Sequence, residues 1–361
     1  MKIYFVFFFY FFFSTIAKSM RYVMMIPLRR CGSNAVRLRL DLHPDVFAPY
    51  PLHIHDFFPL LCQYGDLSID ENYQRLIIDV IGFLHTSPLR WSSFSPDPFC
   101  VMETLCKEDV QKRSLYRVVY EMYCMGAVQH GARVVLDKSQ DSVLEWREWV
   151  KTIPDILFLD VVRDPRAQIA SMNQCILHDF YTHLNLKTWL HRRSLVEEIR
   201  SEYPEKILTV RYEDFVHDPE EFFRTVCGFM SIPYHPTVLD VTCSEEAYRM
   251  SRTSPLWENN DSQPIESSLH KYEHSLSIAE IRRIERATQE YMRQHHYAYE
   301  MDSPQTFLIK EEKEKIDEEK EENIQKENER RRIKFLEWLR KKFPQDYWMR
   351  MGRWRYLKSL Q

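Results

Sequence analysis

The sequence predicts an α/β protein in which a mainly parallel central sheet is flanked by helices. Two features of the chain lead to this prediction. Short runs rich in Val, Ile, Leu and Phe have the composition of buried strands, and longer segments with helical patterns separate them. Strands that alternate with helices form parallel sheets that are covered on both faces. Because ligands bind such sheets beyond the carboxyl ends of the strands, we expect the functional residues in the loops that follow the strands.

Four strands and eight helices are expected along the main part of the chain. The strands are expected over residues 22–26, 133–136, 156–162 and 207–210. The helices are expected over residues 34–42, 71–84, 110–125, 142–151, 166–172, 186–202, 219–229 and 278–294. The stretch 88–98 is rich in Pro and Ser and is expected to be a loop between helices.

Length and composition limit the number of domains and the kinds of partner. A chain of 361 residues, 44% of them apolar, can form one large α/β domain with an appendage. The formal net charge of −4 gives no sequence-wide indication of nucleic-acid binding, so no nucleic-acid partner is expected. The eight cysteines stand singly, without a C-x-x-C pair or a histidine cluster at zinc spacing. Structural zinc is therefore not expected, while reduced thiols and disulfides both stay open.

The first 19 residues form a hydrophobic segment that has two interpretations. Residues 3–17 are almost wholly apolar, but this run is shorter than the ~20 residues that span a bilayer. Lys2 before the run and the small-x-small pattern at residues 17–19 resemble a signal peptide or a signal anchor. The chain would then enter a secretory lumen or stay associated with a membrane. Alternatively, Met20 is the true start and the protein is cytoplasmic.

A change of composition near Asp302 separates a main domain, residues 20–301, from a tail, residues 302–361. Residues 310–330 are almost wholly charged, with opposite signs at i,i+3 and i,i+4 spacing, which predicts a solvated, coiled-coil-like helix. Residues 331–361 are basic and aromatic. This second half is expected to dock on the domain as an amphipathic helix or to lie on an anionic membrane surface.

The segment that follows the first predicted strand has the composition of an anion site. Residues 27–37 read P-L-R-R-C-G-S-N-A-V-R, a basic turn with one glycine before a helix start. A helix N-terminus offers free N–H groups and a partial positive charge, Gly32 permits close approach of an anion, and Arg30 adds a fixed charge. Ser33 and Asn34 add short donors. The first glycine and the lysine of G-x-x-x-x-G-K-S/T are missing, which argues against an ordinary NTPase or kinase.

A second basic turn follows the third predicted strand. Here the chain reads Arg163-Asp164-Pro165-Arg166, and Ser171 comes one to two helical turns later. Pro165 suits a first helical turn and Asp164 can cap it, while Arg163 and Ser171 can share an anionic oxygen. A single phosphate group fits between them. Taken alone, each of the two turns is also compatible with an ordinary helix cap.

Together the two turns resemble the nucleotide-binding motifs of sulfotransferases that use 3′-phosphoadenosine 5′-phosphosulfate (PAPS). The turn at residues 163–166 with Ser171 is similar to the 3′-phosphate motif, and residues 27–37 look like the 5′-phosphosulfate loop. The resemblance covers roughly residues 21–297 and is of the kind seen in many Golgi-type and bacterial members. It implies a three-layer sandwich like that of the P-loop NTPases. Three further stretches carry the resemblance, namely His43-Pro44-Asp45-Val46, Asp137-Lys138-Ser139 and Arg211-Tyr212-Glu213-Asp214-Phe215.

The resemblance implies transfer of a sulfuryl group from PAPS to a hydroxyl acceptor by in-line displacement, with a carbohydrate or small molecule favoured. PAPS is the expected cofactor, and no metal is expected because the sequence shows no acidic ligand cluster. Arg30 is expected to stabilise the bridging and leaving oxygens electrostatically. Arg163 and Ser171 are expected to hold the 3′-phosphate. The other expected cofactor-binding residues are Cys31, Gly32, Ser33, Asn34 and Tyr212.

The expected proton acceptor departs from the family pattern. Tyrosine-sulfating relatives use a glutamate and cytosolic relatives a histidine, whereas Tyr50 and Pro51 occupy the glutamate position in this chain. His53 is the favoured base because a histidine near its ordinary pKa of ~6.5 can accept a proton, and His55 competes with it. Both histidines are also compatible with a purely structural role. Lys138 either contacts the transferring sulfuryl group or is an exposed lysine.

Two other functions stay open from the sequence. A P-loop-like kinase or nucleotide hydrolase would need a metal-binding carboxylate and magnesium. A non-catalytic adaptor would keep the PAPS-binding fold and recruit partners through its charged tail. The oligomeric state and the identity of the acceptor cannot be derived from these residues.

Overall fold

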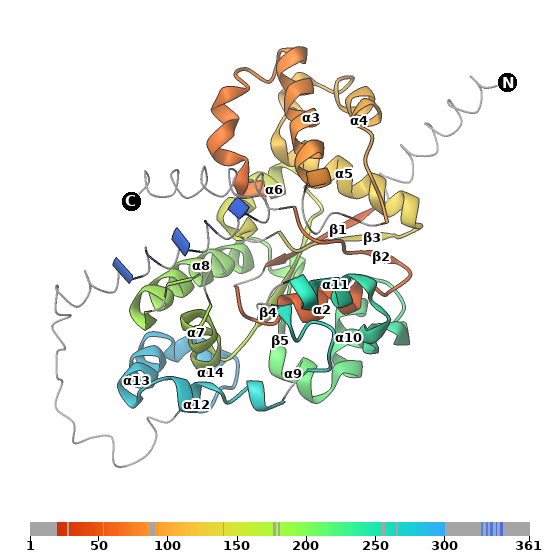
Figure 1. Cartoon of the computed structure of the whole chain (residues 1–361). Coiled ribbons are helices and arrows are strands. Elements are labelled where there is room, and N and C mark those ends of the chain that lie inside the picture. Colours follow the sequence, from red (N-terminus) through yellow and green to blue (C-terminus); the bar gives the residue numbers. More distant parts are fainter. Residues whose placement is uncertain are drawn as a thin grey trace.

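A five-stranded sheet forms the centre of the computed structural model, with the strands in the order β2-β3-β1-β4-β5 and all neighbours parallel (Figure 1). The structure describes residues 20–299 apart from 27–28, 53, 87–90, 92, 140, 176–177, 180, 254–256 and 265, together with eight residues between 326 and 341. The predicted α/β class with a mainly parallel sheet is confirmed. The strands are β1 (Arg21–Ile26), β2 (Val46–Phe47), β3 (Val134–Asp137), β4 (Leu157–Val162) and β5 (Ile207–Arg211).

Side chains of β1 alternate between two hydrophobic clusters, because successive residues of a strand point to opposite faces of the sheet. Tyr22 and Met24 pack on one face with four helices and with Val196 and Ile199 of a fifth, α8 (Thr182–Glu202), and Val23 and Met25 pack on the other face with three. All of these side chains are buried, as expected for a central parallel strand. The first group is α3 (Asp70–Thr86), α4 (Pro98–Leu105), α5 (Leu115–His130) and α6 (Trp146–Thr152), and the second is α2 (Ser33–Leu40), α9 (Tyr212–His217) and α10 (Pro219–Phe229).

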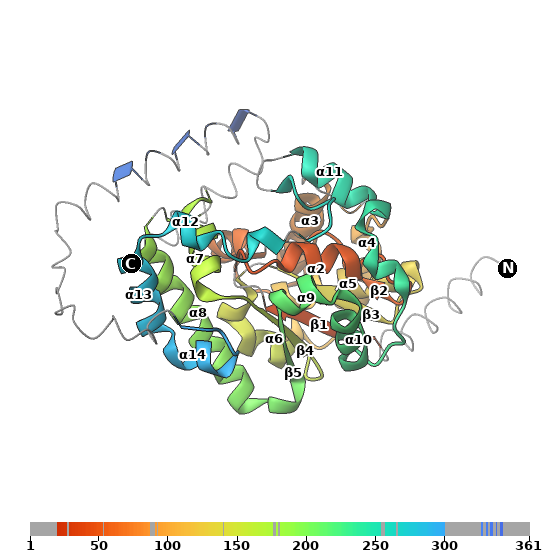
Figure 2. The ribbon, with the colours of Figure 1, turned by 90° about the horizontal axis from the view of Figure 1, so that it is seen from below.

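A third group of helices packs at the β4–β5 side of the sheet. Figure 2 shows α7, α8, α13 and α14 on the opposite side of the molecule from α10 and α11. A buried ion pair of 2.7 Å joins Arg166 of α7 to Glu285 of α13, and Tyr297 donates a hydrogen bond of 2.9 Å to Glu213. The C-terminal helices are thereby attached to the turn that follows β4. The elements are α7 (Pro165–Asn173), α8 (Thr182–Glu202), α11 (Glu245–Thr253), α12 (Tyr272–Ser275), α13 (Ile278–Ala287) and α14 (Gln289–Gln294).

Some elements differ from the sequence prediction. The strand β2 and the helices α4, α9, α11 and α12 were not predicted. Helix α5 begins at Leu115 rather than at residue 110, because the side chain of Ser114 accepts a hydrogen bond from the Arg117 N–H and caps the helix. The helix expected over 142–151 begins as a 3-10 turn, Ser142–Glu145, and continues as α6. The helix expected over 278–294 is divided at Thr288 into α13 and α14.

The chain ends lie largely outside the described residues. Residues 1–19 are not described, so the expectations of a signal peptide or a membrane anchor stay predictions. Of the tail, eight residues between 326 and 341 are described, and they are helical and exposed. Within the described part of the chain, no helix is both long enough and apolar enough to cross a membrane. All eight cysteines are described, and none of them forms a disulfide.

Candidate active site

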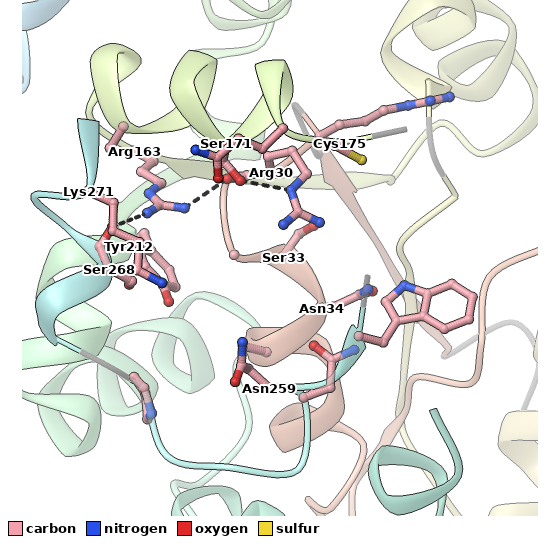
Figure 3. Close-up of a pocket in the computed structure, with 18 of the residues that line it drawn as sticks. Arg30, Ser33, Asn34, Arg163, Ser171, Cys175, Tyr212, Asn259, Ser268 and Lys271 are labelled. Carbon is pink, nitrogen blue, oxygen red and sulfur yellow. Dashed lines mark hydrogen bonds between the residues drawn. The ribbon is translucent and has the colours of Figure 1, made fainter. Parts of the chain in front are cut away.

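A cavity of about 370 Å³ lies where the turns after β1, β3 and β4 meet (Figure 3). Its size is typical of small-molecule sites, and most of its lining side chains are polar. The strands β3, β1 and β4 are neighbours and run in the same direction, so their carboxyl ends meet at one edge of the sheet. The cavity brings together eight residues singled out in the sequence, namely Arg30, Gly32, Ser33, Asn34, Lys138, Arg163, Ser171 and Tyr212.

The turn after β1 has an unusual backbone conformation. Arg30 has a φ of 69° and Gly32 has a φ of 88°, so two residues of this turn are left-handed. A β-carbon built on Gly32 would lie 2.1 Å from Cδ2 of Tyr212, because the tyrosine ring packs directly on the glycine. The turn leads into α2 at Ser33, where the first N–H groups have no carbonyl one turn earlier to accept from them. Ser33, Asn34 and Ala35 line the cavity, and a helix end of this kind can bind an anion.

Hydrogen bonds tie the turn after β1 to the helix after β4. The Nε of Arg30 donates to the Ser171 hydroxyl at 3.0 Å, as Figure 3 shows. One Nη of Arg163 donates to the Arg30 carbonyl at 3.1 Å, and Gln168 donates to the Arg29 carbonyl at 2.8 Å. The strained turn is therefore held by three contacts from a single neighbouring segment. This arrangement fixes the Arg30 guanidinium over the cavity before any ligand is present.

Arg163 is held on three sides. Its second Nη donates to the Ser268 carbonyl at 2.8 Å, and its guanidinium lies 4.9 Å from the ring centroid of Tyr212. The Nε of Arg163 and the Ser268 hydroxyl are buried and have no hydrogen-bond partner among the described residues. Both residues line the cavity, so two buried polar groups beside it have unused hydrogen-bonding capacity. An unpaired buried donor is costly, and an anionic oxygen would satisfy it.

The turn that carries Arg163 is itself fixed by side chains. Asp164 caps α7 by accepting from the Arg166 N–H at 2.8 Å, and Pro165 occupies the first helical position. The Asp164 N–H donates to the Glu213 carboxylate at 3.0 Å. Glu213 follows β5, so the turns after β4 and β5 support each other. Burial raises the pKa of Glu213, while these hydrogen bonds favour its charged form.

Lys138 is buried, with only 3% of its surface exposed, and it reaches the cavity from the end of β3. The expectation of an exposed lysine is therefore wrong. Burial, together with the positive charges of Arg37, Arg29 and Arg30, lowers the pKa of Lys138 to about 7 against the opposing effect of Cys31. An anion in the cavity would reverse this balance and favour the ammonium form.

A buried polar network fixes the turn around Lys138. The preceding residue, Asp137, accepts hydrogen bonds from the hydroxyls of Tyr22 and Tyr123 at 2.9 and 3.1 Å. It also accepts from the Ser139 N–H at 2.8 Å and from the Ser139 hydroxyl at 2.6 Å. The Ser139 hydroxyl lies 2.7 Å from the Leu52 carbonyl, so the same network reaches the segment that ends at Leu52. The position of Lys138 is therefore set by the core of the sheet.

Three of the expected residues need separate comment. The Cys31 side chain is fully buried in the core and does not face the cavity, and burial raises the pKa of its thiol. His53 lies outside the described residues. His55 is buried, is paired with Glu145 at 2.5 Å and does not line the cavity. Neither of the two histidines predicted from the sequence is therefore seen at the cavity among the described residues.

The sequence reasoning missed one wall of the cavity. Residues 257–260 and 262–264 line this wall with Ser268, Lys271 and Ser275, and Figure 3 shows Asn259, Ser268 and Lys271 among the lining residues. A polar stretch with Trp257, Glu258, Asn259 and Asn260 was the available signal, but it has neither strand nor helix periodicity. Their contribution follows from the fold, which brings this segment against α2 and α7.

Comparison with known proteins gives a consistent result. A model of the sulfotransferase family, described as "Sulfotransferase family", matches residues 23–236. The structure is similar to the sulfotransferase domain of the Synechococcus PCC 7002 olefin synthase, with a TM-score of 0.52 and 18% identity over 77% of this chain and 94% of that chain. It is also similar to the sulfotransferase domain of the curacin biosynthetic pathway, with a TM-score of 0.51 and 18% identity over 78% of this chain and 98% of that chain. A search of curated proteins found no match.

Proposed function

The chain belongs to the sulfotransferase family, and on this premise we propose that it transfers a sulfuryl group from PAPS to a hydroxyl acceptor. One observation carries the proposal. Two basic turns, from the ends of β1 and β4, meet at one cavity and are joined by the hydrogen bond from Arg30 to Ser171. Each turn leads into a helix N-terminus, which favours a phosphate or sulfate group. A donor with two separate anionic groups matches two such turns.

The residues of the cavity fit this donor. The N-terminus of α2, with Arg30 and Lys138 beside it, would hold the 5′-phosphosulfate. Arg163, Ser171 and Ser268 would hold the 3′-phosphate, and the unpaired Arg163 Nε and Ser268 hydroxyl support this assignment. Lys271 lines the same region and adds a positive charge. Gly32 allows the Tyr212 ring to pack directly on this turn, because a β-carbon there would collide with the ring.

The proposed mechanism is electrostatic. When bound, PAPS supplies an activated sulfuryl group whose transfer releases 3′-phosphoadenosine 5′-phosphate (PAP). Arg30 would stabilise the negative charge that grows on the leaving phosphate, since a guanidinium stays charged and is held in place by Ser171. Lys138 would face the sulfuryl oxygens. Positioning and charge stabilisation account for catalysis in such displacements.

The test is a calorimetric titration of the full chain with PAP, with ATP plus magnesium as the comparison. Binding of PAP without binding of ATP and magnesium is the expected result. It would be followed by transfer from radiolabelled PAPS to a panel of alcohols, phenols and carbohydrates, with carbohydrate or small-molecule acceptors favoured. No PAP binding would overturn the proposal. Preference for ATP and magnesium would favour a kinase or nucleotide hydrolase, and PAP binding without any transfer would favour a non-catalytic adaptor.

The affinity for PAP is expected to fall as the pH rises from about 7 towards about 9, by up to about tenfold per pH unit. The Lys138 ammonium favours binding of the anion, and the anion raises the pKa of Lys138 above its unbound value of about 7. Below that value the unbound protein already holds the proton, and above it the proton must be taken up from solvent. Titrations in buffers with different ionisation enthalpies measure both the affinity and the proton uptake.

Lys138→Met is the control for this pH dependence. The variant should bind PAP more weakly than the wild type near pH 6, and its affinity should lose the decline above pH 7 together with the proton uptake. If the variant declines as steeply as the wild type, another group is responsible.

A further inference from the structure

His178 is the sole histidine among the described residues that line the cavity. It lies beyond the end of α7, and it is buried, with 7% of its surface exposed. The backbone N–H of His178 donates to the Cys175 carbonyl at 3.0 Å, and the backbone N–H of Cys175 donates to the Met172 carbonyl at 2.9 Å. Two successive turns therefore join His178 to the helix that carries Ser171. Figure 3 shows Cys175 on the same wall of the cavity as Ser171 and Arg30.

The charged groups around His178 place it at the Arg30 end of the cavity. The positive charges of Arg29, Arg192 and Arg30 act on His178, and the negative charge of Asp141 acts against them. Asp141 is itself paired with Arg29 and with Arg192, at 2.6 Å in both cases. Arg163, Ser268 and Lys271 line the other region, which was assigned above to the 3′-phosphate. His178 therefore lies on the side of the sulfuryl group.

The same surroundings keep the imidazole neutral. Burial, followed by the positive charges of Arg29, Arg192 and Arg30, holds the pKa of His178 well below its ordinary value. A neutral imidazole can accept a proton, whereas an imidazolium cannot. The negative donor would offset the positive neighbours during the reaction and make the imidazole more basic. His178 thus combines access to the cavity with the protonation state that a general base requires.

We propose that His178 accepts the proton of the acceptor hydroxyl during sulfuryl transfer. This assignment rests on the proposed sulfotransferase function and names the general base of the same site. A bond forms between the acceptor oxygen and sulfur, and the bond between sulfur and the bridging phosphate oxygen breaks, with its electron pair leaving on PAP. The hydroxyl proton moves to an imidazole nitrogen of His178 and then passes to solvent. Atoms and charge balance without a further reactant.

The test compares the wild type with His178→Gln and His178→Ala, and it uses His191→Gln as the matched control. His191 is an exposed histidine on α8 and does not line the cavity. Transfer from PAPS is measured with the alcohol of the panel that reacts fastest and with 4-nitrophenol above neutral pH. The alcohol needs a base, whereas the nitrophenol is already ionised. Both His178 variants should lose about 10²-fold or more in kcat with the alcohol and far less with the nitrophenol.

Three further readouts separate a base from a structural residue. PAP affinity should change by less than about threefold in the His178 variants, because a general base acts in the transfer step and is not needed for binding. Added imidazole should partly restore alcohol sulfation by His178→Ala. The NMR signal of the His178 ring can be assigned by its absence from the spectrum of His178→Gln. In the wild type this signal should shift when PAP is added.

Two kinds of failure can be distinguished. If the wild type binds no PAP or transfers no sulfuryl group, the proposed function is overturned and the assignment of His178 with it. If the wild type is active but His178→Gln keeps more than about a third of its kcat with the alcohol, the assignment alone is overturned. Equal losses with the alcohol and the ionised nitrophenol, or a PAP affinity that falls as much as kcat, also overturn it.

Discussion

Arg30→Ala is expected to lower kcat for sulfuryl transfer by about 10²–10³-fold while the affinity for PAP falls by less than about tenfold. Arg30 is held over the cavity by Ser171 at 3.0 Å, in a backbone conformation that few residues other than glycine adopt. A guanidinium held in this way can stabilise the negative charge that develops on the leaving phosphate only in the transition state. Single-turnover rates and calorimetric titrations with PAP measure the two effects separately.

Arg30→Lys is the control for this prediction. It keeps the positive charge but cannot reproduce the planar contact with Ser171, so its kcat should lie between those of the wild type and Arg30→Ala. A loss of PAP affinity as large as the loss of kcat would show that Arg30 acts through ground-state binding. In that case the electrostatic role assigned to it would have to be withdrawn.

Arg163→Ala is expected to weaken PAP binding by about 10–150-fold, the range for a charged hydrogen bond worth about 1.5–3 kcal/mol. Arg163 has a buried Nε without a hydrogen-bond partner in the described part of the chain. Most of the stabilisation from this donor should therefore arise when an anion binds. The substitution also removes the contacts to the Arg30 and Ser268 carbonyls. The turn after β1 should loosen as a result.

The thermal stability of the unbound protein separates these contributions. Arg163→Ala should lower Tm modestly and PAP affinity strongly, whereas Arg224→Ala should leave PAP affinity unchanged. Arg224 is half exposed and pairs with Glu220 on α10, away from the cavity. If Arg163→Ala binds PAP as tightly as the wild type, the 3′-phosphate is held elsewhere. If it fails to fold, Arg163→Lys provides the milder change.

The parts of the fold that could be predicted are those with a strong local pattern. The helix expected over 219–229 is found as α10 (Pro219–Phe229), because Asp218 caps it and Phe222 and Val226 supply a buried stripe. The helix expected over 278–294 is divided at Thr288, whose backbone departs from helical geometry with a φ of −116° and a ψ of 16°. The Thr288 hydroxyl also donates to the Ile284 carbonyl, a local bond that the periodicity does not reveal. The strand β2 has two residues, too few for any pattern.

The candidate site was predictable only in part for a related reason. The two basic turns follow strands, so parallel topology alone indicates that Arg30 and Arg163 lie at one edge of the sheet. Lys271 and Ser268 reach the cavity from short 3-10 and helical turns that are placed by tertiary packing. His178 lies beyond the end of α7 and lines the cavity, although no helix or strand pattern of the sequence marks it.

The attachment of α12, α13 and α14 has a consequence for the order in which the protein becomes functional. Ser268 and Lys271 belong to a segment synthesised long after Arg30, and Arg166 meets Glu285 only when α13 has docked. A nascent chain that has released β1 to β5 therefore has a sheet but no complete cavity. A ligand that contacts both parts stabilises their docking, since it binds the assembled state alone. PAP should accordingly slow amide hydrogen exchange in α13 and α14, although neither helix lines the cavity.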